Sequence, residues 1–181
     1  EWITSEYGAP GITITTPKVL KRIEVPIPEE MKQKVKVAAF GYGGINSNLD
    51  IVVISTKIAQ QNPSQSQNGQ SQDGNQIDLL QVAEQQLLQL EAKGAQNIIT
   101  KNEQFITPNG QEGLKTFGTA DFAHPVTGKV EEGNYIILGF STQNLIQQVV
   151  LIWKQDDTYA DEIIDRVLNS IELIKLEEEE K

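Results

Sequence analysis

The sequence predicts an α+β domain in which antiparallel strands form the sheet and two amphipathic helices cover it. Three observations lead to this class. Runs of β-branched residues alternate with turn signals, two segments repeat apolar residues at helical spacing, and the later strands are joined by tight turns. The length of 181 residues lies in the usual single-domain range.

The first part of the chain contains three expected strands. Residues 11–17 alternate isoleucine with threonine and end in proline, which is the period-2 pattern of a half-buried strand. Residues 35–43 and 49–59 are two further runs rich in β-branched side chains. Residues 44–48 between them hold the glycine and asparagine that turns use to reach positive φ, so the two runs predict a hairpin.

A glutamine-rich stretch at residues 60–75 decides the domain organisation. If it were an interdomain linker, residues 1–59 would have to fold as three strands with one bare face. We therefore expect one domain over residues 1–175, with the stretch as a flexible surface loop. A recognition loop is the functional alternative, although the stretch lacks an apolar or aromatic anchor. The acidic residues 176–181 are expected to form a frayed tail.

Residues 76–94 predict the first helix. Asn75 is the expected N-cap, and Gly94 lies where a left-handed C-terminal cap belongs. The apolar stripe at helical spacing consists of Leu80, Ala83, Leu87 and Leu90.

After this helix the pattern predicts an antiparallel meander that begins at Asn97. The extended stretch breaks at residues 108–110, where Asn-Gly is a strong hairpin signal. Two more strands, residues 134–142 and 144–153, are separated by a very short turn.

The last predicted element is a second helix over residues 158–174. Thr158 and Asp161 are spaced as a capping box. One apolar stripe is formed by Ala160, Ile164, Val167 and Ile171, and it is widened by Ile163 and Leu168.

Composition excludes several classes of function. A formal net charge of −10 argues against binding to nucleic acid, and no window holds the roughly 20 apolar residues of a membrane helix. The chain has no cysteine, so disulfides, thiolate catalysis and cysteine-based metal centres are excluded. The chain begins at Glu1 and its single methionine is Met31, so we expect a processed or trimmed product. A signal peptide or lipid anchor upstream stays open.

His124 is the only histidine, and Asp121 lies three residues before it. A metal ligand or general base would use such a carboxylate neighbour. The other members of a triad or metal cluster do not form a pattern, which favours an exposed histidine at a strand end. We therefore assign no catalytic, cofactor-binding or metal-ligating residue and expect no enzyme.

The remaining large amphipathic side chains are Trp2, Tyr7, Tyr42, Trp153 and Tyr159. Trp153 closes a strand and Tyr159 opens a helix, so both are expected to pack at the seam between sheet and helix. Trp2 and Tyr7 are expected outside regular structure, where a partner surface is the alternative to packing.

The order of these elements, with the strands NYIILGFST and NLIQQVVLIW and the closing helix ADEIIDRVLNSIEL, resembles the PsbP-like superfamily. That superfamily takes in extrinsic photosystem II proteins, the Ran-binding nuclear import factor, and bacterial envelope proteins and lipoproteins. The resemblance covers most of the chain and implies an antiparallel β-sheet sandwiched between helices, an α/β/α sandwich. It offers no catalytic motif and implies a non-enzymatic adaptor or binding domain.

The functional expectation is therefore a non-enzymatic binding or adaptor domain that acts on a protein partner, with no cofactor and no nucleic acid. The resemblance implies a periplasmic or envelope-associated location, and the cytoplasm stays open. The domain itself is not expected to insert into a membrane. The alternative function is a small-ligand or divalent-metal site near His124 and Asp121.

Overall fold

The structure is a computed structural model. It describes residues 1–8, 11–25, 27–30, 32–43, 49–58, 78–124, 126–142 and 145–173. The predicted loop at 60–75 and the predicted tail at 176–181 lie outside these described residues.

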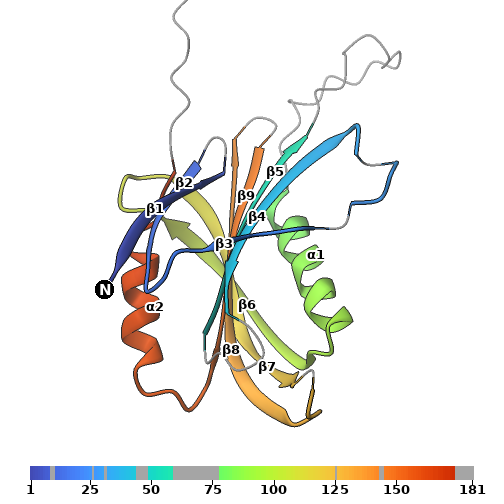
Figure 1. Cartoon of the computed structure of the whole chain (residues 1–181), viewed down its shortest axis with the longest axis vertical. Helices are drawn as coiled ribbons and strands as arrows, with labels where there is room; N and C mark the ends of the chain where they lie inside the picture. Colours follow the sequence, from blue (N-terminus) through green and yellow to red (C-terminus); the bar gives the residue numbers. More distant parts are fainter. Residues whose placement is uncertain are drawn as a thin grey trace, which may run out of the picture.

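The expected α/β/α sandwich is wrong. Of the described residues, 57% lie in strands and 16% in helices, and the strands form two antiparallel sheets. The smaller sheet lies beside α2, so one face of the main sheet is covered by a mixed layer of strands and a helix (Figure 1).

The main sheet has seven strands, and every neighbouring pair is antiparallel. In spatial order they are β3 (Lys21–Ile23), β4 (Val35–Tyr42), β5 (Leu49–Ile58), β9 (Leu145–Lys154), β8 (Val130–Thr142), β7 (Glu112–Ala123) and β6 (Gln96–Ile106). β9 is the central strand, and nearly all of its residues are buried because both faces of the sheet are covered there. β3 and β6 are the two edges.

The smaller sheet has three strands in the order β1 (Ile3–Gly8), β2 (Gly11–Thr16) and β10 (Glu172–Leu173). The predicted helix over 158–174 is therefore too long, since α2 (Ala160–Leu168) ends before these last residues turn back onto β2. The hydroxyl of Ser170 helps to fix this turn because it accepts a hydrogen bond from the backbone N–H of Thr15 at 2.8 Å.

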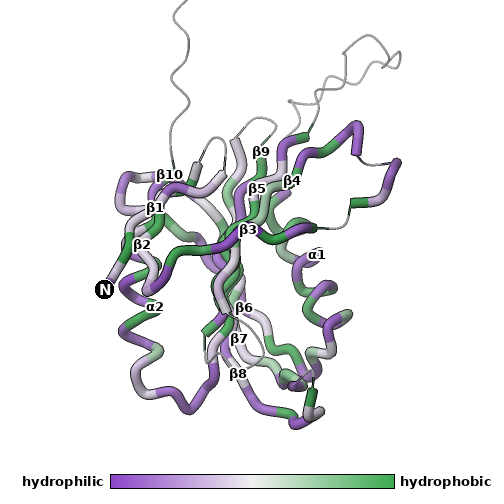
Figure 2. Tube along the Cα trace, viewed as in Figure 1, coloured by the Kyte–Doolittle hydropathy of each residue, from purple (hydrophilic) through white to green (hydrophobic). Residues whose placement is uncertain are grey.

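Two apolar clusters lie on opposite faces of the main sheet because side chains alternate along β8 and β9. One cluster joins Leu138 and Leu151 to Ile12 of the small sheet and Ile164 of α2. The other cluster lies under α1 (Leu79–Ala92) and includes Leu90, Tyr135, Ile137 and Val150. Figure 2 shows apolar and hydrophilic positions alternating along both helices, as expected of elements with one buried face.

The strands predicted at 11–17, 35–43, 49–59, 134–142 and 144–153 are confirmed with small shifts of their ends, as is the hairpin at 108–110 between β6 and β7. β1, β3 and β10 were not predicted. None of the helices in the described part of the chain is long and apolar enough to cross a membrane.

The ends of α1 follow the prediction in part. The predicted N-cap Asn75 lies outside the described residues, and Asp78 serves as N-cap because its Oδ1 accepts from the Leu80 N–H at 3.0 Å. Gly94 does adopt the left-handed conformation, with φ of 102°, and its N–H donates to the carbonyl of Glu91 at 2.9 Å. Leu80 is 44% exposed, so its predicted place in the buried stripe is wrong.

The start of α2 differs from the predicted capping box. The N-cap is Tyr159, which has a helical backbone and no side-chain cap, and its N–H donates to Oδ1 of Asp157 at 3.0 Å. The Tyr159 ring is 74% exposed, so its predicted packing is wrong, whereas Trp153 is buried in the core as predicted. The predicted stripe is confirmed within α2 by buried Ala160, Ile164, Val167 and Leu168, whereas buried Ile171 lies beyond the end of the helix.

Trp2 and Tyr7 belong to the molecule's own packing. Tyr7 lies in β1, is buried, and its hydroxyl accepts from the Leu20 N–H at 2.8 Å. Trp2 packs against the same core, and the guanidinium of Arg166 lies 4.1 Å from its ring centroid. The expectation that both lie outside regular structure is therefore wrong for Tyr7.

Candidate functional site

The two residues singled out by the sequence, Asp121 and His124, lie at the end of β7, and each makes its own hydrogen bonds. Oδ2 of Asp121 accepts from the side-chain amide of Asn97 at 2.7 Å. Nδ1 of His124 accepts from the backbone N–H groups of Val126 and Thr127, at 3.2 Å and 3.1 Å. His124 therefore holds the loop between β7 and β8 in place.

This arrangement gives little support to a metal site. An imidazole that accepts at Nδ1 carries its proton on Nε2, so neither ring nitrogen of neutral His124 offers a free lone pair. Among the residues that the structure describes, no group of three or more histidine, aspartate and glutamate side chains could hold a metal ion.

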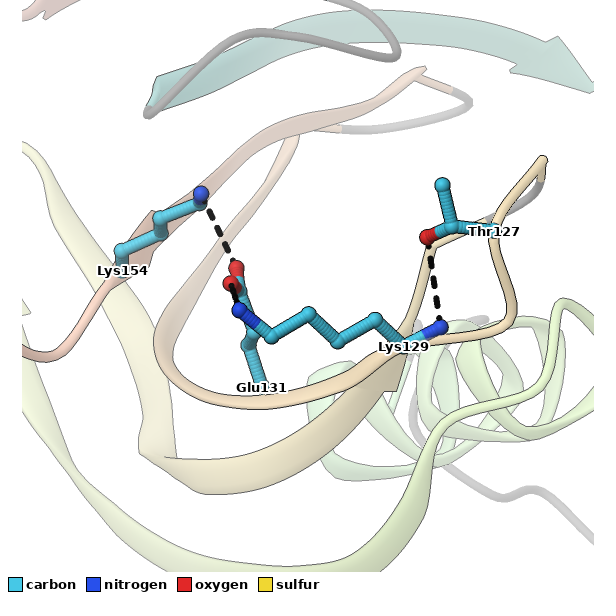
Figure 3. Close-up of polar contacts among 4 residues, drawn as sticks. All are labelled: Thr127, Lys129, Glu131 and Lys154. Carbon is cyan, nitrogen blue, oxygen red and sulfur yellow. Dashed lines mark hydrogen bonds and ion pairs between the residues drawn. The ribbon is translucent and has the colours of Figure 1, made fainter.

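A cluster of charges lies near the same end of the sheet, centred on Glu131 of β8 (Figure 3). Its two carboxylate oxygens contact Nζ of Lys129 at 3.2 Å and Nζ of Lys154 at 2.9 Å. The hydrogen bond from Lys154, and then the one from Lys129, lower the pKa of the Glu131 carboxyl, and Glu131 in turn raises the pKa of Lys154. Lys129 is exposed, and Glu131 and Lys154 leave 38% and 43% of their side-chain surface in water, so the cluster ties the loop and β9 to β8 only weakly.

An open groove of about 600 Å³ lies where α1 begins beside β6 and β7. Seven residues line it: Asp78, Leu79, Leu80, Gln104, Glu112, Gly113 and Leu114. They come from three separate parts of the chain, which the sheet brings together because Gln104 of β6 lies opposite Leu114 of β7.

The floor of the groove is apolar. Leu79 lies over Gly139 of β8, with its Cδ2 3.5 Å from the position a Cβ on that glycine would take. Leu80 leaves 44% of its surface exposed, and Leu114 is half-buried. These leucines offer apolar surface that the described part of the chain does not fully cover.

The rim of the groove is acidic. The carboxylates of Asp78 and Glu112 both belong to exposed residues, and Gln104 adds an exposed amide. None of the seven lining residues is a lysine or arginine. The groove therefore combines an apolar floor with negative charge.

Sequence reasoning missed this groove. The helical spacing places Leu80 in the buried stripe of the first helix, and the pattern at residues 112–114 predicts only an extended stretch. The one usable signal was the pair Leu79-Leu80, since two adjacent leucines at a helix start cannot both point into the core.

No family model matches the chain. No curated protein sequence matches it either. Among solved structures, a Pseudomonas aeruginosa protein of unknown function, PA94, matches with a TM-score of 0.43 and 7% sequence identity over 88% of this chain and 100% of that chain. A match at this level supports no conclusion about function, so the role of the groove is argued from its own residues.

Proposed function

We propose that this chain is a non-enzymatic binding domain that holds a segment of a partner protein in the groove between α1, β6 and β7. The observation that carries the proposal is the pairing of exposed leucine surface with two carboxylates at the rim. A matching segment has an apolar side chain next to a lysine or arginine.

The apolar floor supplies the affinity in this proposal. Leu80 lies in the first turn of α1 with 44% of its surface exposed, and covering it removes apolar surface from water. An open groove suits an extended peptide better than a small ligand, because small-ligand pockets enclose most of the ligand surface.

The acidic rim supplies the selectivity. Asp78 and Glu112 favour a basic side chain and disfavour an acidic one, which costs free energy when it is brought next to like charge. The net charge of −10 acts in the same direction, because the field of the whole chain attracts a basic partner and speeds its approach.

The wider context of the proposal rests on the resemblance alone. Membership of the PsbP-like superfamily and a place in the bacterial envelope or periplasm stay predictions. The groove itself does not depend on either of them.

A peptide-binding measurement tests the function. The probes are fluorescein-labelled hexapeptides with a central leucine flanked by lysine or arginine, and the same peptides with glutamate in the flanking positions. We expect the basic peptides to raise fluorescence polarisation and the acidic ones to leave it unchanged. Two groove variants, Leu80→Asp and Glu112→Lys, should weaken binding about tenfold or more, which corresponds to losing one contact of about 1.4 kcal/mol.

Leu88→Asp is the matched control. It places the same charge on the same helix, at a leucine that is 54% exposed and does not line the groove. Equal loss of binding in Leu80→Asp and Leu88→Asp would show that the groove is not the site. Failure of every basic peptide to bind would contradict the proposed ligand chemistry.

A further inference from the structure

The outer edge of β6 is a long stretch of unpaired strand. β6 has 11 residues and is the last strand of the main sheet, so in the described part of the chain nothing pairs with its outer side. Nearly all of its residues are exposed, including Ile99 at 61% and Ile106 at 56%. Such an edge presents a row of backbone donors and acceptors to any strand of suitable pattern.

The inner side of β6 is held by side-chain hydrogen bonds in addition to its pairing with β7. The hydroxyl of Tyr135 donates to the Ile99 carbonyl at 2.9 Å, and the hydroxyl of Thr116 donates to Oδ1 of Asn102 at 2.7 Å. The irregular part of β6 is confined to its start, where the register with β7 shifts between Gln96 and Ile99. From Ile99 onward the strand is regular and contains no proline.

The charge pattern of this regular part is self-complementary. It carries one cation, Lys101, and one anion, Glu103, placed symmetrically about Asn102. The segment is therefore neutral in a chain whose net charge is −10, so two copies of β6 do not share the repulsion of the rest of the surface.

We infer that β6 pairs with β6 of a second copy of this chain, antiparallel and about a two-fold axis at Asn102. This register sets Lys101 opposite Glu103 of the second copy and Ile99 opposite Phe105 of the second copy, each pair occurring twice. The interface uses the same patch on both copies, as two-fold symmetry requires. The two main sheets then continue into each other. This inference does not depend on the groove.

The charges select this register over its neighbours. In an antiparallel pair, directly opposite side chains point to the same face of the sheet. The two-fold axis must therefore pass through a residue and not between two, and the neighbouring registers have the axis at Lys101 or at Glu103. An axis at Lys101 sets that lysine opposite itself, and an axis at Glu103 sets two glutamates opposite each other. Like charges directly opposite destabilise a strand pair, whereas unlike charges stabilise it.

The face that carries these pairs is already organised within each copy. Glu103 is held by Lys115 of β7, with Nζ and Oε1 3.2 Å apart. Phe105 packs edge-on against Phe140 with ring centroids 6.0 Å apart. Both side chains are therefore positioned before the second copy arrives, which reduces the loss of conformational entropy on pairing.

The competing explanation is protective. Charged side chains on an edge strand often prevent pairing between copies. That role needs only charge, and it gives no reason for opposite charges at symmetric positions. The two explanations differ in what a charge reversal does, because reversal breaks a complementary pair but preserves a protective charge.

Sedimentation equilibrium of the whole chain separates them. The wild-type chain should form dimers in the micromolar range. Lys101→Glu should weaken the dimer about tenfold or more, since each glutamate then faces Glu103 of the second copy. Glu103→Lys should act likewise, and the double variant Lys101→Glu/Glu103→Lys should recover the dimer because its pairs are again unlike.

Lys101→Glu is the cleaner single variant, because it leaves the ion pair between Glu103 and Lys115 in place. Lys36→Glu, on an exposed position of β4, is the control for the change in net charge and should leave the dimer unchanged. A wild-type chain that stays monomeric at concentrations 100-fold above the micromolar range overturns the inference. Equal dimerisation of Lys101→Glu and the wild type overturns it too, as does a double variant that is no better than the single ones.

Discussion

Tyr135 ties the central part of the main sheet to its edge. Its hydroxyl donates to the backbone carbonyl of Ile99 on β6, 2.9 Å away, although β7 lies between their strands. The hydroxyl of Thr100, also on β6, lies 2.7 Å from the Tyr135 hydroxyl. The tyrosine ring is fully buried, and burial raises the pKa of its hydroxyl. The long edge strand is thus anchored from two strands away.

Gly118 of β7 makes room for this contact. A Cβ at this position would lie 1.8 Å from the Ile99 carbonyl oxygen. Gly118→Ala should therefore destabilise the fold by about 1–3 kcal/mol through overpacking, measured by urea unfolding. Gly139→Ala on β8 is the control, since its Cβ would meet only Leu79, at an ordinary 3.5 Å. Equal stability of Gly118→Ala and the wild type would show that β6 does not lie this close to β7.

Ile164 tests the predicted stripe of α2. It is 4% exposed and belongs to the larger apolar cluster, so Ile164→Ala should lower the free energy of unfolding by about 2–5 kcal/mol. Leu88→Ala on the exposed side of α1 removes the same number of carbons but loses fewer contacts. It should therefore change the free energy of unfolding by less than about 0.5 kcal/mol. Thermal or urea unfolding measures both. Similar losses for the two variants would mean that the faces of the helices are misassigned.

Gln148 is a buried polar residue whose exchange should stabilise the chain. It is 6% exposed, and its Oε1 has no hydrogen-bond partner among the described residues. Gln148→Met removes the unsatisfied amide oxygen with little change of volume, so the free energy of unfolding should rise by about 1–2 kcal/mol. Urea unfolding measures the gain. A loss of stability of that size would show that the amide is in fact satisfied.

Glu131 gives a prediction for pH. Lys154 and Lys129 lower its pKa in the folded chain, so the ionised carboxylate contributes stability that is present above the pKa of the unfolded chain. This contribution is lost as the pH falls through the lower, folded value. A carboxyl-detected NMR titration should place the pKa of Glu131 below that of an ordinary glutamate, and Lys154→Met should move it back up. Because the pair is exposed, added salt should have the same effect. An unchanged pKa in Lys154→Met would contradict the contact.

The sequence predicted the elements that carry a strong local pattern and missed those without one. β8 and β9 were recognisable because they are buried and rich in β-branched side chains. The end of the second helix was misplaced because Ile171 and Leu173 continue the helical spacing while the backbone has already left the helix to pair with β2. A short strand made by long-range pairing leaves no local pattern.

The same reason explains the candidate sites. The groove combines Asp78, Gln104 and Glu112, which lie in three separate segments, so no spacing in the sequence relates them. His124 stood out because it is a single histidine beside a carboxylate, yet its ring caps a loop. The free edge at β6 could be recognised only once the strand order was known.

A single cysteine at position 102 tests the pairing of two copies most directly. The chain has no cysteine of its own, so Asn102→Cys carries one thiol per copy. A two-fold axis at this residue brings the two Cα atoms to about 4.5–5.5 Å, within the range of a disulfide. Gln104→Cys is the control, because its two copies lie four residues apart along the strands, about 14 Å. Mild oxidation should link Asn102→Cys into a covalent dimer and leave Gln104→Cys unlinked. No dimer from Asn102→Cys, or equal dimer from both, would contradict the pairing.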